Sequence, residues 1–545
     1  MKLKKDSSTQ KLRGAYYTPK VLADFIVKNI EKKDNMKILE PSCGDGVFLE
    51  SISEYIKDEQ IKSVEAIEII NEEAKKVKNR GYGKKYKIIN TDFLDFYHNN
   101  KNKRYDLIVG NPPYIRYQYL SKKQREIQSE ILTNNGMKSN KLINSWVCFL
   151  VASVEMLADK GSIGFVIPAE LLQVVYAEDL RQYLSNHLAK ITLLTFKELV
   201  FPKIEQEIVV FIGEKDYTVL NEETVISVVE YNNFVDMLKH DISKIEYQRI
   251  ENTKEKWTHY FLNGEENNLV YEYRNHMKFT TFDKIALVNV GITTGNNKYF
   301  SVERDIVKKY NLENVVLPLI GRSAHADGLF FNEENWKKNI AKDKRAQLIL
   351  FPENIPYEEY PKEHKAYIDL GENTEQNIGY KCRIRDRWYI IPSIWTPDAF
   401  FLRRNNKFPK FVLNEINAVS TDTMHRIKFK EHINKRKALL SYYNSITFAF
   451  TEINGRSYGG GVLEILPREV GSVVLPEIQS MDSRVCDELL EIVDDYISNK
   501  KDINELLDIV DNAVLHEHLG LNQDTTHAFR MIWKKLMNRR LKRSR

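Results

Sequence analysis

The four residues Asn111-Pro112-Pro113-Tyr114 have the groups needed to hold an exocyclic amine on a flat ring. Such an amine is a poor nucleophile because its lone pair is delocalised into the ring, so a catalyst should accept its hydrogens. Asn111 offers a side-chain carbonyl and Pro112 a backbone carbonyl, both in a stiff stretch of chain. Tyr114 offers an aromatic face on which the ring can stack. Taken alone, the tetrapeptide is equally typical of a surface turn.

The apolar run Leu107-Ile108-Val109, just before this tetrapeptide, predicts a buried parallel strand. Two consecutive prolines prevent that strand from continuing into a ladder or a helix. We therefore expect the tetrapeptide to form a rigid turn at the carboxyl end of the strand. Open α/β sheets bind their ligands at this end.

An earlier strand, turn and helix suit a nucleotide-like cofactor. A short strand is predicted over 37–40, and Gly44 and Gly46 in the following turn allow the backbone to approach a ligand closely. The third glycine of a dinucleotide fingerprint is absent. Glu40, beside Pro41, can form a salt bridge with a ligand ammonium. These two points favour S-adenosylmethionine over a nicotinamide cofactor.

Two acids follow on the next predicted strands. Glu68 ends a strand over 64–68, where a carboxylate can accept hydrogen bonds from both ribose hydroxyls. A surface glutamate at a strand end is the alternative for this residue. A third strand is predicted over 88–94, where Asp92 can accept from an adenine amino group and Phe93 can cover the ring.

The segment 14–30 predicts a loop, including Tyr17, followed by a helix. Thr18 is expected to be the N-cap and Pro19 the first helical residue. The free N–H groups at a helix start can bind an anion such as an amino-acid carboxylate. Helix capping alone also explains this Thr-Pro pair.

The Thr-Pro helix, the glycine turn, the two acids and the Asn-Pro-Pro-Tyr tip follow one another within the first part of the chain. In this order they resemble the gamma class of S-adenosylmethionine-dependent DNA adenine-N6 methyltransferases. The resemblance implies methyl transfer to N6 of an adenine flipped out of duplex DNA, with no metal. It also implies the modification role of a type II restriction-modification system, in which a separate restriction endonuclease is a possible partner.

The resemblance also implies the fold and the roles of single residues. The expected fold is α/β, with a doubly wound (Rossmann-like) methyltransferase sheet, then an α+β target-recognition domain and a helical C-terminal segment. The catalytic residues would be those of the tip, with Tyr114 and Phe201 stacking on the target base. Phe201 as a plain core residue is the alternative. The implied cofactor-binding residues are Tyr17, Thr18, Glu40, Pro41, Gly44, Gly46, Glu68, Asp92, Phe93 and Asn111.

The similarity continues with a helix expected over 142–158 and a fifth strand over 161–169. Between them and the tip, the polar segment 119–141 has little apolar periodicity. It is expected either to order when DNA arrives or to remain a solvated loop.

The expected domains are residues 1–265 for cofactor binding and catalysis, 266–475 for target recognition, and 476–545 as a helical segment with a basic tail. The stretch 380–389 is expected to be a strand whose alternating Arg383, Arg385 and Arg387 share one face and bind DNA. A solvated strand face is the alternative. Residues 530–545 carry eight Lys or Arg and no acid, which suits either a phosphate-binding tail or a frayed end.

Composition is that of an ordinary water-soluble protein. The 545 residues include 81 basic and 76 acidic side chains, which leave a net charge of only +5. Four cysteines without paired spacing argue against a disulfide framework or a zinc cluster. No apolar run reaches the roughly 18 residues that a membrane span requires. We expect a cytoplasmic protein, monomeric and independent of membranes.

Two other functions remain possible on the sequence alone. One is a methyltransferase acting on the side-chain amide (N5) of a protein glutamine, because that family resembles this one at the tip. The glutamine methyltransferase family does not explain the second half of this chain, which is rich in basic and aromatic residues. The other is a non-catalytic DNA-specificity subunit, against which the complete set of cofactor acids argues.

Overall fold

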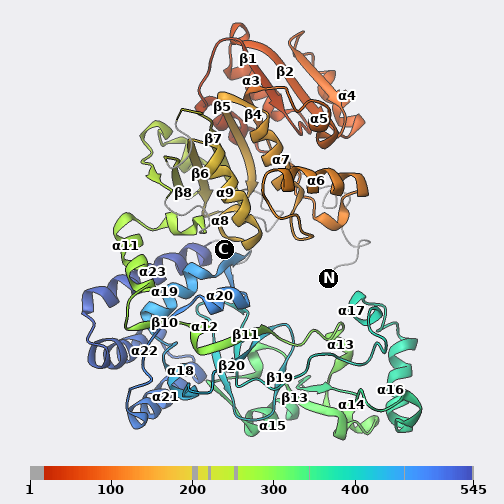
Figure 1. The fold of residues 1–545 in the computed structure, drawn as a ribbon, viewed down its shortest axis with the longest axis vertical. Helices are drawn as coiled ribbons and strands as arrows, with labels where there is room; N and C mark the ends of the chain where they lie inside the picture. Colours follow the sequence, from red (N-terminus) through yellow and green to blue (C-terminus); the bar gives the residue numbers. More distant parts are fainter. Residues whose placement is uncertain are drawn as a thin grey trace. The chain divides into compact units, whose positions relative to one another are not determined.

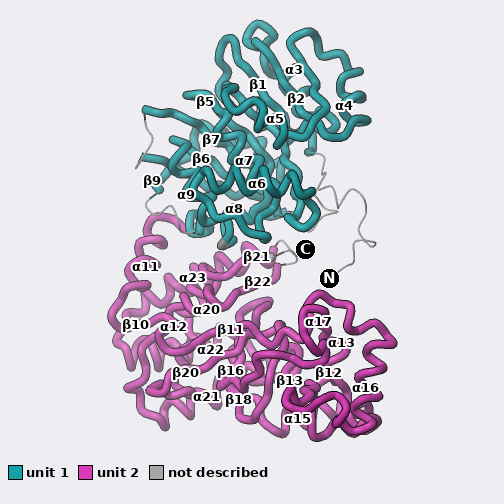
Figure 2. The backbone as a smooth tube through the Cα atoms, turned by 45° about the vertical axis from the view of Figure 1, so that its right-hand side comes forward, with its two compact units in different colours: residues 1–261 teal, residues 262–545 magenta. Residues whose placement is uncertain are grey.

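The computed structural model describes residues 18–198, 200, 207–218, 223–250, 256–342, 344–458 and 461–542. Tyr17 and Phe201, two positions singled out from the sequence, lie outside these residues. The chain divides into two compact units, residues 1–261 and 262–545 (Figure 2). Each unit has cores of its own, and each is described separately.

A nine-stranded sheet, counted over the described residues, runs through the first unit in the order β3-β2-β1-β4-β5-β7-β6-β8-β9 (Figure 1). Its strands are β1 Met36–Glu40, β2 Ile61–Glu68, β3 Tyr86–Asn90, β4 Tyr105–Gly110, β5 Leu157–Pro168, β6 Lys190–Phe196, β7 Ile208–Glu214, β8 Val225–Tyr231 and β9 Gln248–Arg249. The five strands from β3 to β5 run parallel, whereas β7 is antiparallel to both of its neighbours. The order reverses between β1 and β4, which makes this pair the topological switch point.

Helices cover both faces of this sheet, and the alternation of side chains along each strand decides which core a residue joins. Ile38 and Leu107 pack on one face, whereas their chain neighbours Leu39 and Ile108 pack on the other. The first face is covered by α2 Lys20–Asn29, α3 Val47–Tyr55 and α4 Asn71–Lys78, and the second by α5 Phe93–Asn99, α7 Ser145–Glu155 and α9 Glu178–His187. The predicted doubly wound sheet is therefore confirmed.

Much of the polar segment 119–141 is a helix and not a solvated loop, which was one of the two expectations for it. Helix α6 runs over Lys122–Asn134 and begins with a capping box, in which Ser121 and Gln124 each accept a hydrogen bond from the backbone N–H of the other. Ile131 and Leu132 at its end are buried in the core on the α7 face. Both its cap and its apolar end thus have partners within this unit.

The second unit contains several small sheets. The largest, five-stranded over the described residues, has the order β11-β20-β16-β18-β14. Its strands are β11 Ala286–Val290, β20 Met424–Phe429, β16 Ala399–Leu402, β18 Phe411–Asn414 and β14 Phe330–Phe331. A second sheet, β12-β15-β13-β19, is formed by β12 Ser301–Val302, β15 Gln347–Ile349, β13 Val316–Ile320 and β19 Val419–Ser420, and its surroundings form a separate core.

The C-terminal helices belong to the same core as the five-stranded sheet. They are α21 Ser483–Ser498, α22 Ile503–Val510 and α23 Gln523–Lys542, and they pack with α19 Ser445–Asn454. The expected boundary at 475/476 falls within β23 Val474–Pro476, which pairs with β10 Phe279–Thr281. The predicted helical C-terminal segment is confirmed from Ser483 onward, and it is part of one compact unit with the sheet.

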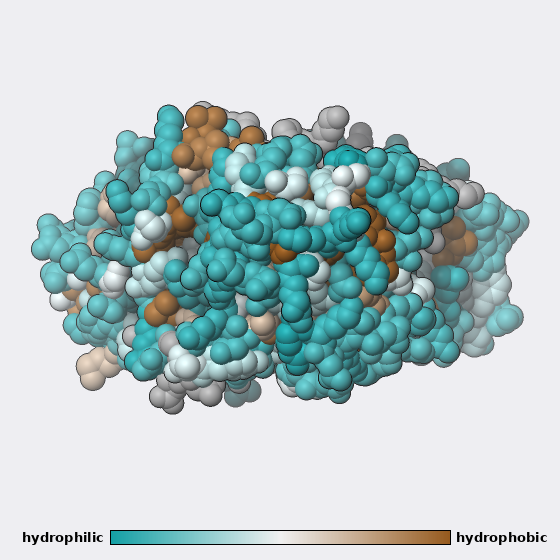
Figure 3. Space-filling model, turned by 90° about the horizontal axis from the view of Figure 1, so that it is seen from above, coloured by the Kyte–Doolittle hydropathy of each residue, from teal (hydrophilic) through white to brown (hydrophobic). Residues whose placement is uncertain are grey.

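The surface of the molecule is mainly polar on the face drawn in Figure 3, where hydrophobic residues form separate groups between hydrophilic ones. Within the described residues, none of the helices combines the length and the apolar character that crossing a bilayer demands.

Candidate active site

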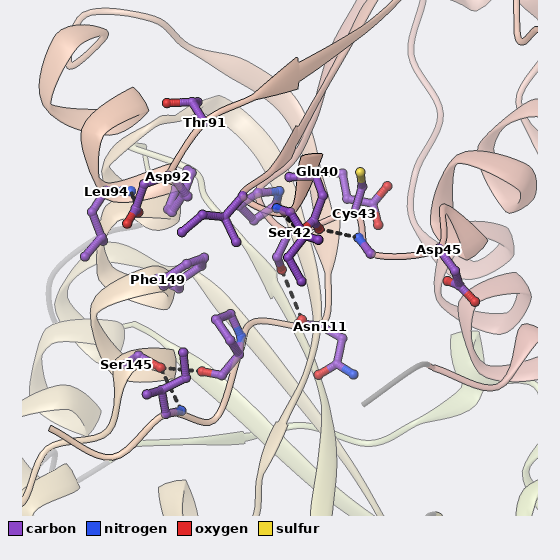
Figure 4. A pocket seen from close by; sticks show the side chains of 18 of the residues that line it. Glu40, Ser42, Cys43, Asp45, Thr91, Asp92, Leu94, Asn111, Ser145 and Phe149 are labelled. Carbon is purple, nitrogen blue, oxygen red and sulfur yellow. Dashed lines mark hydrogen bonds between the residues drawn. The ribbon is translucent and has the colours of Figure 1, made fainter. Parts of the chain in front are cut away.

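A cavity of about 420 Å³ opens at the carboxyl ends of β1, β2, β3 and β4, beside the switch point of the first sheet (Figure 4). Its size is within the range of small-molecule sites. Most of the residues predicted to bind a cofactor line it, namely Thr18, Glu40, Pro41, Gly44, Glu68, Asp92, Phe93 and Asn111. The fold therefore brings together side chains that the sequence places on four different strand ends.

Glu40, the last residue of β1, is almost fully buried at this cavity, and its Oε2 has no hydrogen-bond partner within the described residues. Burial raises the pKa of its carboxyl well above the ordinary 4.5, and the nearby carboxylates of Asp45 and Glu68 raise it further. A buried carboxylate oxygen without a partner is costly unless a cation approaches it. One carboxyl oxygen of Glu40 is thus open to a ligand in this cavity, and the ammonium expected at this residue stays a prediction.

The glycine turn between β1 and α3 is held by the end of β2. The carboxylate of Glu68 accepts hydrogen bonds from the backbone N–H of Gly44, at 2.9 Å, and of Ile70, at 2.8 Å. Gly44 and Gly46 have positive φ angles of 51° and 83°, which favour glycine. A Cβ at position 46 would also lie only 3.2 Å from both γ-methyl groups of Val77.

Asp92 is the N-cap of α5 and lies beyond the end of β3, which stops at Asn90 and not at 94 as predicted. One of its carboxylate oxygens accepts from the Leu94 N–H at 2.8 Å, and the other accepts from the Gln124 side chain at 2.7 Å. Each oxygen keeps a further lone pair. Phe93 is buried, and its ring centroid lies 4.8 Å from that of Phe149 on α7.

The Asn-Pro-Pro-Tyr tip leaves β4 immediately after Gly110. The hydroxyl of Ser42 donates to the Asn111 carbonyl at 3.0 Å, and the hydroxyl of Ser145 donates to the Pro113 carbonyl at 2.5 Å (Figure 4). Ser145 also accepts from the Ile115 N–H at 3.0 Å. The tip is therefore bonded to the turn after β1 on one side and to the first residue of α7 on the other.

Tyr114 is half-buried and anchored by its hydroxyl, which donates to the Val166 carbonyl of β5 at 2.9 Å. Its ring packs against both cores of the first unit. This bond fixes the direction of the ring relative to β4 and β5.

The helix start near Thr18 differs from the prediction by one residue. Helix α2 begins at Lys20, Pro19 occupies the N-cap position, and no side-chain cap is present. Thr18 is instead buried and lines the cavity. The backbone of Pro19 is extended, with ψ at 135°. Pro19 is therefore the last residue before the helix and not its first helical residue.

The sequence did not reveal several residues of this site: Ser42, Gln124, Ser145 and Phe149. A local signal existed for Gln124 only, because Ser121-Lys122-Lys123-Gln124 has the spacing of a capping box. The other three act through contacts with segments distant in the chain.

The arginine row expected on a strand is not formed. Residues Tyr380–Arg383 are a short helix, α17, with Cys382 buried inside it. Arg385 donates to the backbone carbonyls of Thr293 and Thr294, both at 2.8 Å. Arg387 donates to two more carbonyls, of Ile355 at 2.7 Å and of Glu353.

These bonds fold the segment back on the second unit, so the three guanidiniums do not share one strand face. Arg383 is exposed, and within the described residues it makes no hydrogen bond or ion pair. Of the three, it is the one whose charge is available to a ligand.

The basic tail is partly internal. Arg540 is buried in an ion pair with Glu452, at 2.6 Å, and also donates to the Gly461 carbonyl at 2.6 Å. Arg530 pairs with Asp511, also at 2.6 Å. Two of the tail's cations therefore stabilise the second unit itself.

A second cavity, of about 1160 Å³, lies within the second unit between the loop after β17 Arg404–Asn405, the connection from α21 to α22, and α23. Six cations line it, Arg404, Lys407, Lys410, Lys500, Lys501 and Lys534, against the two acids Asp327 and Asp502. Lys407, Lys500 and Lys534 form no ion pair within the described residues. The cavity is therefore electropositive.

No cluster of three or more His, Cys, Asp or Glu side chains suited to a metal ion occurs in the described part of the chain. All four cysteines are buried and free.

Comparison with known proteins gives matches over both units. Residues 23–201 match the family Eco57I restriction-modification methylase, and residues 254–515 match the family Type II methyltransferase M.Eco57I, C-terminal domain. Type II methyltransferase M.AccI of Acinetobacter calcoaceticus is 26% identical over 523 residues, which cover 92% of this chain and 93% of that protein. Type II methyltransferase M.HindII of Haemophilus influenzae is 22% identical over 526 residues, 91% of this chain and 96% of the relative.

Among solved structures, the fold is similar to that of the Type IIL restriction-modification enzyme MmeI, solved in complex with DNA, with a TM-score of 0.57 at 11% identity, over 98% of this chain and 80% of that one. The two family matches follow one another along the chain, and the two curated relatives align over nearly their whole length. The chain therefore belongs to the type II restriction-modification methyltransferase family.

Proposed function

We propose that this chain transfers the methyl group of S-adenosylmethionine to N6 of an adenine flipped out of duplex DNA, as a gamma-class modification enzyme. The observation that carries the proposal is the position of the Asn-Pro-Pro-Tyr tip. It stands at the switch point of the sheet, at the edge of a cavity in which the buried Glu40 carboxylate has an unpaired oxygen. An amine acceptor thus lies beside a site suited to an amino-acid cofactor.

The cavity fits S-adenosylmethionine by its donor set. Glu40 would pair with the ammonium of the methionine part, and Glu68 would accept from the ribose hydroxyls through the lone pairs that Gly44 and Ile70 leave open. Asp92 would accept from the adenine amine, and Phe93 would cover the ring. When bound, the cofactor supplies a methyl group made electrophilic by its positive sulfur.

The tip would act on the target base. The Asn111 side-chain oxygen and the Pro112 carbonyl would accept the two N6 hydrogens, which lets the nitrogen become tetrahedral and directs its lone pair at the methyl carbon. Pro113 stiffens the turn. Tyr114, with its hydroxyl anchored on Val166, would present its ring to the base. From the sequence, Phe201 would cover the other face of the base.

We further propose that duplex DNA contacts the second unit at its electropositive cavity. Phosphates are the groups that lysines bind in most protein–DNA interfaces, and three lysines here have no ion-pair partner within the described residues. Flipping a base costs unstacking energy, so the enzyme needs backbone contacts of this kind to hold the distorted duplex.

Sequencing of modified bases in DNA from cells that express the chain tests the proposal. N6-methyladenine at one recurring short motif is the expected result. DNA methylated in this way should resist cleavage by any companion endonuclease that recognises the motif. Methylation on cytosine, or transfer of tritiated methyl to protein glutamine and not to DNA, would refute it. DNA binding without any transfer would point to a specificity subunit.

A further inference from the structure

The backbone carbonyls of Asn111, Pro112 and Pro113 differ in whether a protein group donates a hydrogen bond to them. The Asn111 carbonyl accepts from the Ser42 hydroxyl at 3.0 Å, and the Pro113 carbonyl accepts from the Ser145 hydroxyl at 2.5 Å (Figure 4). The carbonyl between them, on Pro112, receives no hydrogen bond from any residue that the structure describes. Two serine donors thus occupy the flanking carbonyls, whereas the middle one has no donor among the described residues.

The two serines come from different directions. Ser42 belongs to the turn after β1, which lines the cavity, whereas Ser145 is the first residue of α7. Ser145 is 2% exposed and makes three bonds to the tip segment: its hydroxyl donates to Pro113 and accepts from the Ile115 N–H at 3.0 Å, and its own N–H donates to the Ile115 carbonyl at 2.9 Å. A serine hydroxyl has one proton, and that proton is committed to the tip.

We propose that Ser42 and Ser145 are positioning residues that set the orientation of the Pro112 carbonyl and of the Asn111 side chain toward the target amine. This inference rests on the proposed function. Proline rings fix φ at Pro112 and Pro113, and the residue before each proline is confined to extended ψ values, a range that still leaves the carbonyl directions some freedom. A bond to the carbonyl on each side of Pro112 narrows this remaining freedom, so the acceptors stay in place before the base arrives.

Removal of either hydroxyl should therefore slow the chemical step and leave ligand binding nearly intact. We expect Ser145→Ala and Ser42→Ala each to lower kcat by about 10- to 100-fold, the range of a catalytic group displaced by about an ångström. KM for DNA and the dissociation constant of S-adenosylmethionine should change less than about threefold, because neither serine supplies their charged partners. Ser145→Thr keeps the hydroxyl and should restore most of kcat.

The same helix offers a matched control. Ser153 on α7 is also fully buried, and its hydroxyl has no hydrogen-bond partner within the described residues. Ser153→Ala should leave kcat unchanged. The melting temperature of every variant is measured, so that lost activity in a folded variant is separated from unfolding.

The outcomes separate the two proposals. A wild-type chain that methylates no adenine would overturn the proposed function and this inference with it. An active wild type whose Ser42→Ala and Ser145→Ala variants keep kcat within twofold would overturn this inference alone. So would a loss in kcat that Ser145→Thr does not repair in a variant of normal melting temperature, or an equal loss in Ser153→Ala.

Discussion

The carboxylate of Glu68, at the end of β2, accepts a hydrogen bond of 2.9 Å from the backbone N–H of Gly44, in the turn after β1. The acid that we propose for the cofactor ribose thus also holds the glycine turn. Its other oxygen accepts from the Ile70 N–H. The Glu68 side chain therefore holds both the turn after β1 and the segment after β2, which line the same cavity.

Replacing that acid by its amide should affect both roles. In Glu68→Gln, one oxygen can still accept, but the amide NH₂ would face the remaining backbone N–H group. We expect the dissociation constant of S-adenosylmethionine to rise by about 10- to 100-fold, equivalent to the roughly 1.5–3 kcal/mol of a charged hydrogen bond. Titration calorimetry measures it. Glu54→Gln, at an exposed glutamate of α3, is the control, and equal affinities in the two variants would contradict the role.

Asn111 should be required for transfer and not for cofactor binding. Without its side-chain oxygen the target amine loses one acceptor, so Asn111→Ala should lower kcat by at least about 100-fold, as removal of a preorganised polar group does elsewhere. Calorimetry should find cofactor affinity within a few-fold of the parent, since Glu40, Glu68 and Asp92 remain. Asn134→Ala, at the exposed end of α6, should behave as the wild type. Near-normal turnover of Asn111→Ala would end the assignment.

The buried Glu40 should make ligand-free stability depend on pH. Because burial and the neighbouring Asp45 and Glu68 raise its pKa above the ordinary 4.5, the folded chain holds this proton after the unfolded chain has released it. The free energy of unfolding should therefore fall as pH rises from 4.5 to the raised pKa of Glu40, by about 1.4 kcal/mol per unit of pKa difference. Glu40→Gln should flatten this fall.

An ammonium at Glu40 would favour the ionised carboxyl, so in the same pH range the wild type should bind S-adenosylmethionine more tightly as pH rises and release a proton. Calorimetry in two buffers of different ionisation enthalpy counts that proton. Burial raises the pKa of Asp45 and Glu68 as well, and their share of the pH dependence persists in Glu40→Gln. If Glu40→Gln keeps the full dependence and the full affinity, Glu40 does not bind the ammonium.

The sequence correctly predicted the features that neighbouring residues determine, such as strand burial and the strand end at the prolines. The run Leu107-Ile108-Val109 alternates between the two cores, and the prolines after it end the strand where predicted. The acids at strand ends met at one cavity because parallel strands share their carboxyl edge. Ser145 was not predicted because its hydrogen bonds connect segments that are distant in the chain, and no local sequence pattern marks such contacts.

The errors have physical causes too. Alternating charges in 380–389 fit a strand, but a buried Cys382 and carbonyl partners for Arg385 and Arg387 favour a helical turn that folds back on the unit. Short elements of this kind are decided by tertiary contacts and not by propensity. Helix α6 was missed because its apolar end lies behind a polar first half, although its capping box was visible.

Substitution of Arg385 should affect stability, whereas substitution of Arg383 should affect DNA binding. Arg385→Ala removes bonds to the carbonyls of Thr293 and Thr294 and should lower the free energy of unfolding of the second unit by about 1–3 kcal/mol. Arg383→Ala, at an exposed side chain, should leave stability within about 0.5 kcal/mol and act on DNA affinity only. Denaturant unfolding and DNA titration give the two quantities. Equal stability of both variants would show that the Arg385 bonds contribute nothing.

The electropositive cavity of the second unit should govern the salt dependence of DNA binding. Lys407 and Lys534 line it and form no ion pair within the described residues, although the charges of both reach the Asp502 carboxylate, and we expect each to neutralise a phosphate. Each neutralised phosphate contributes about 0.9 to the slope of log K against log salt. The double variant Lys407→Gln/Lys534→Gln should therefore weaken binding to all duplexes alike at low salt and reduce that slope by roughly 1 to 2.

The preference for the recognised motif should remain, because phosphate contacts do not read bases. Affinity for cognate and singly substituted duplexes at several salt concentrations provides the measurement. Lys308→Gln/Lys362→Gln removes the same charge from exposed positions outside the cavity and corrects for net charge. If both double variants change the slope equally, the cavity has no special role, and if the cavity variant loses motif preference, its lysines contact bases and not the backbone.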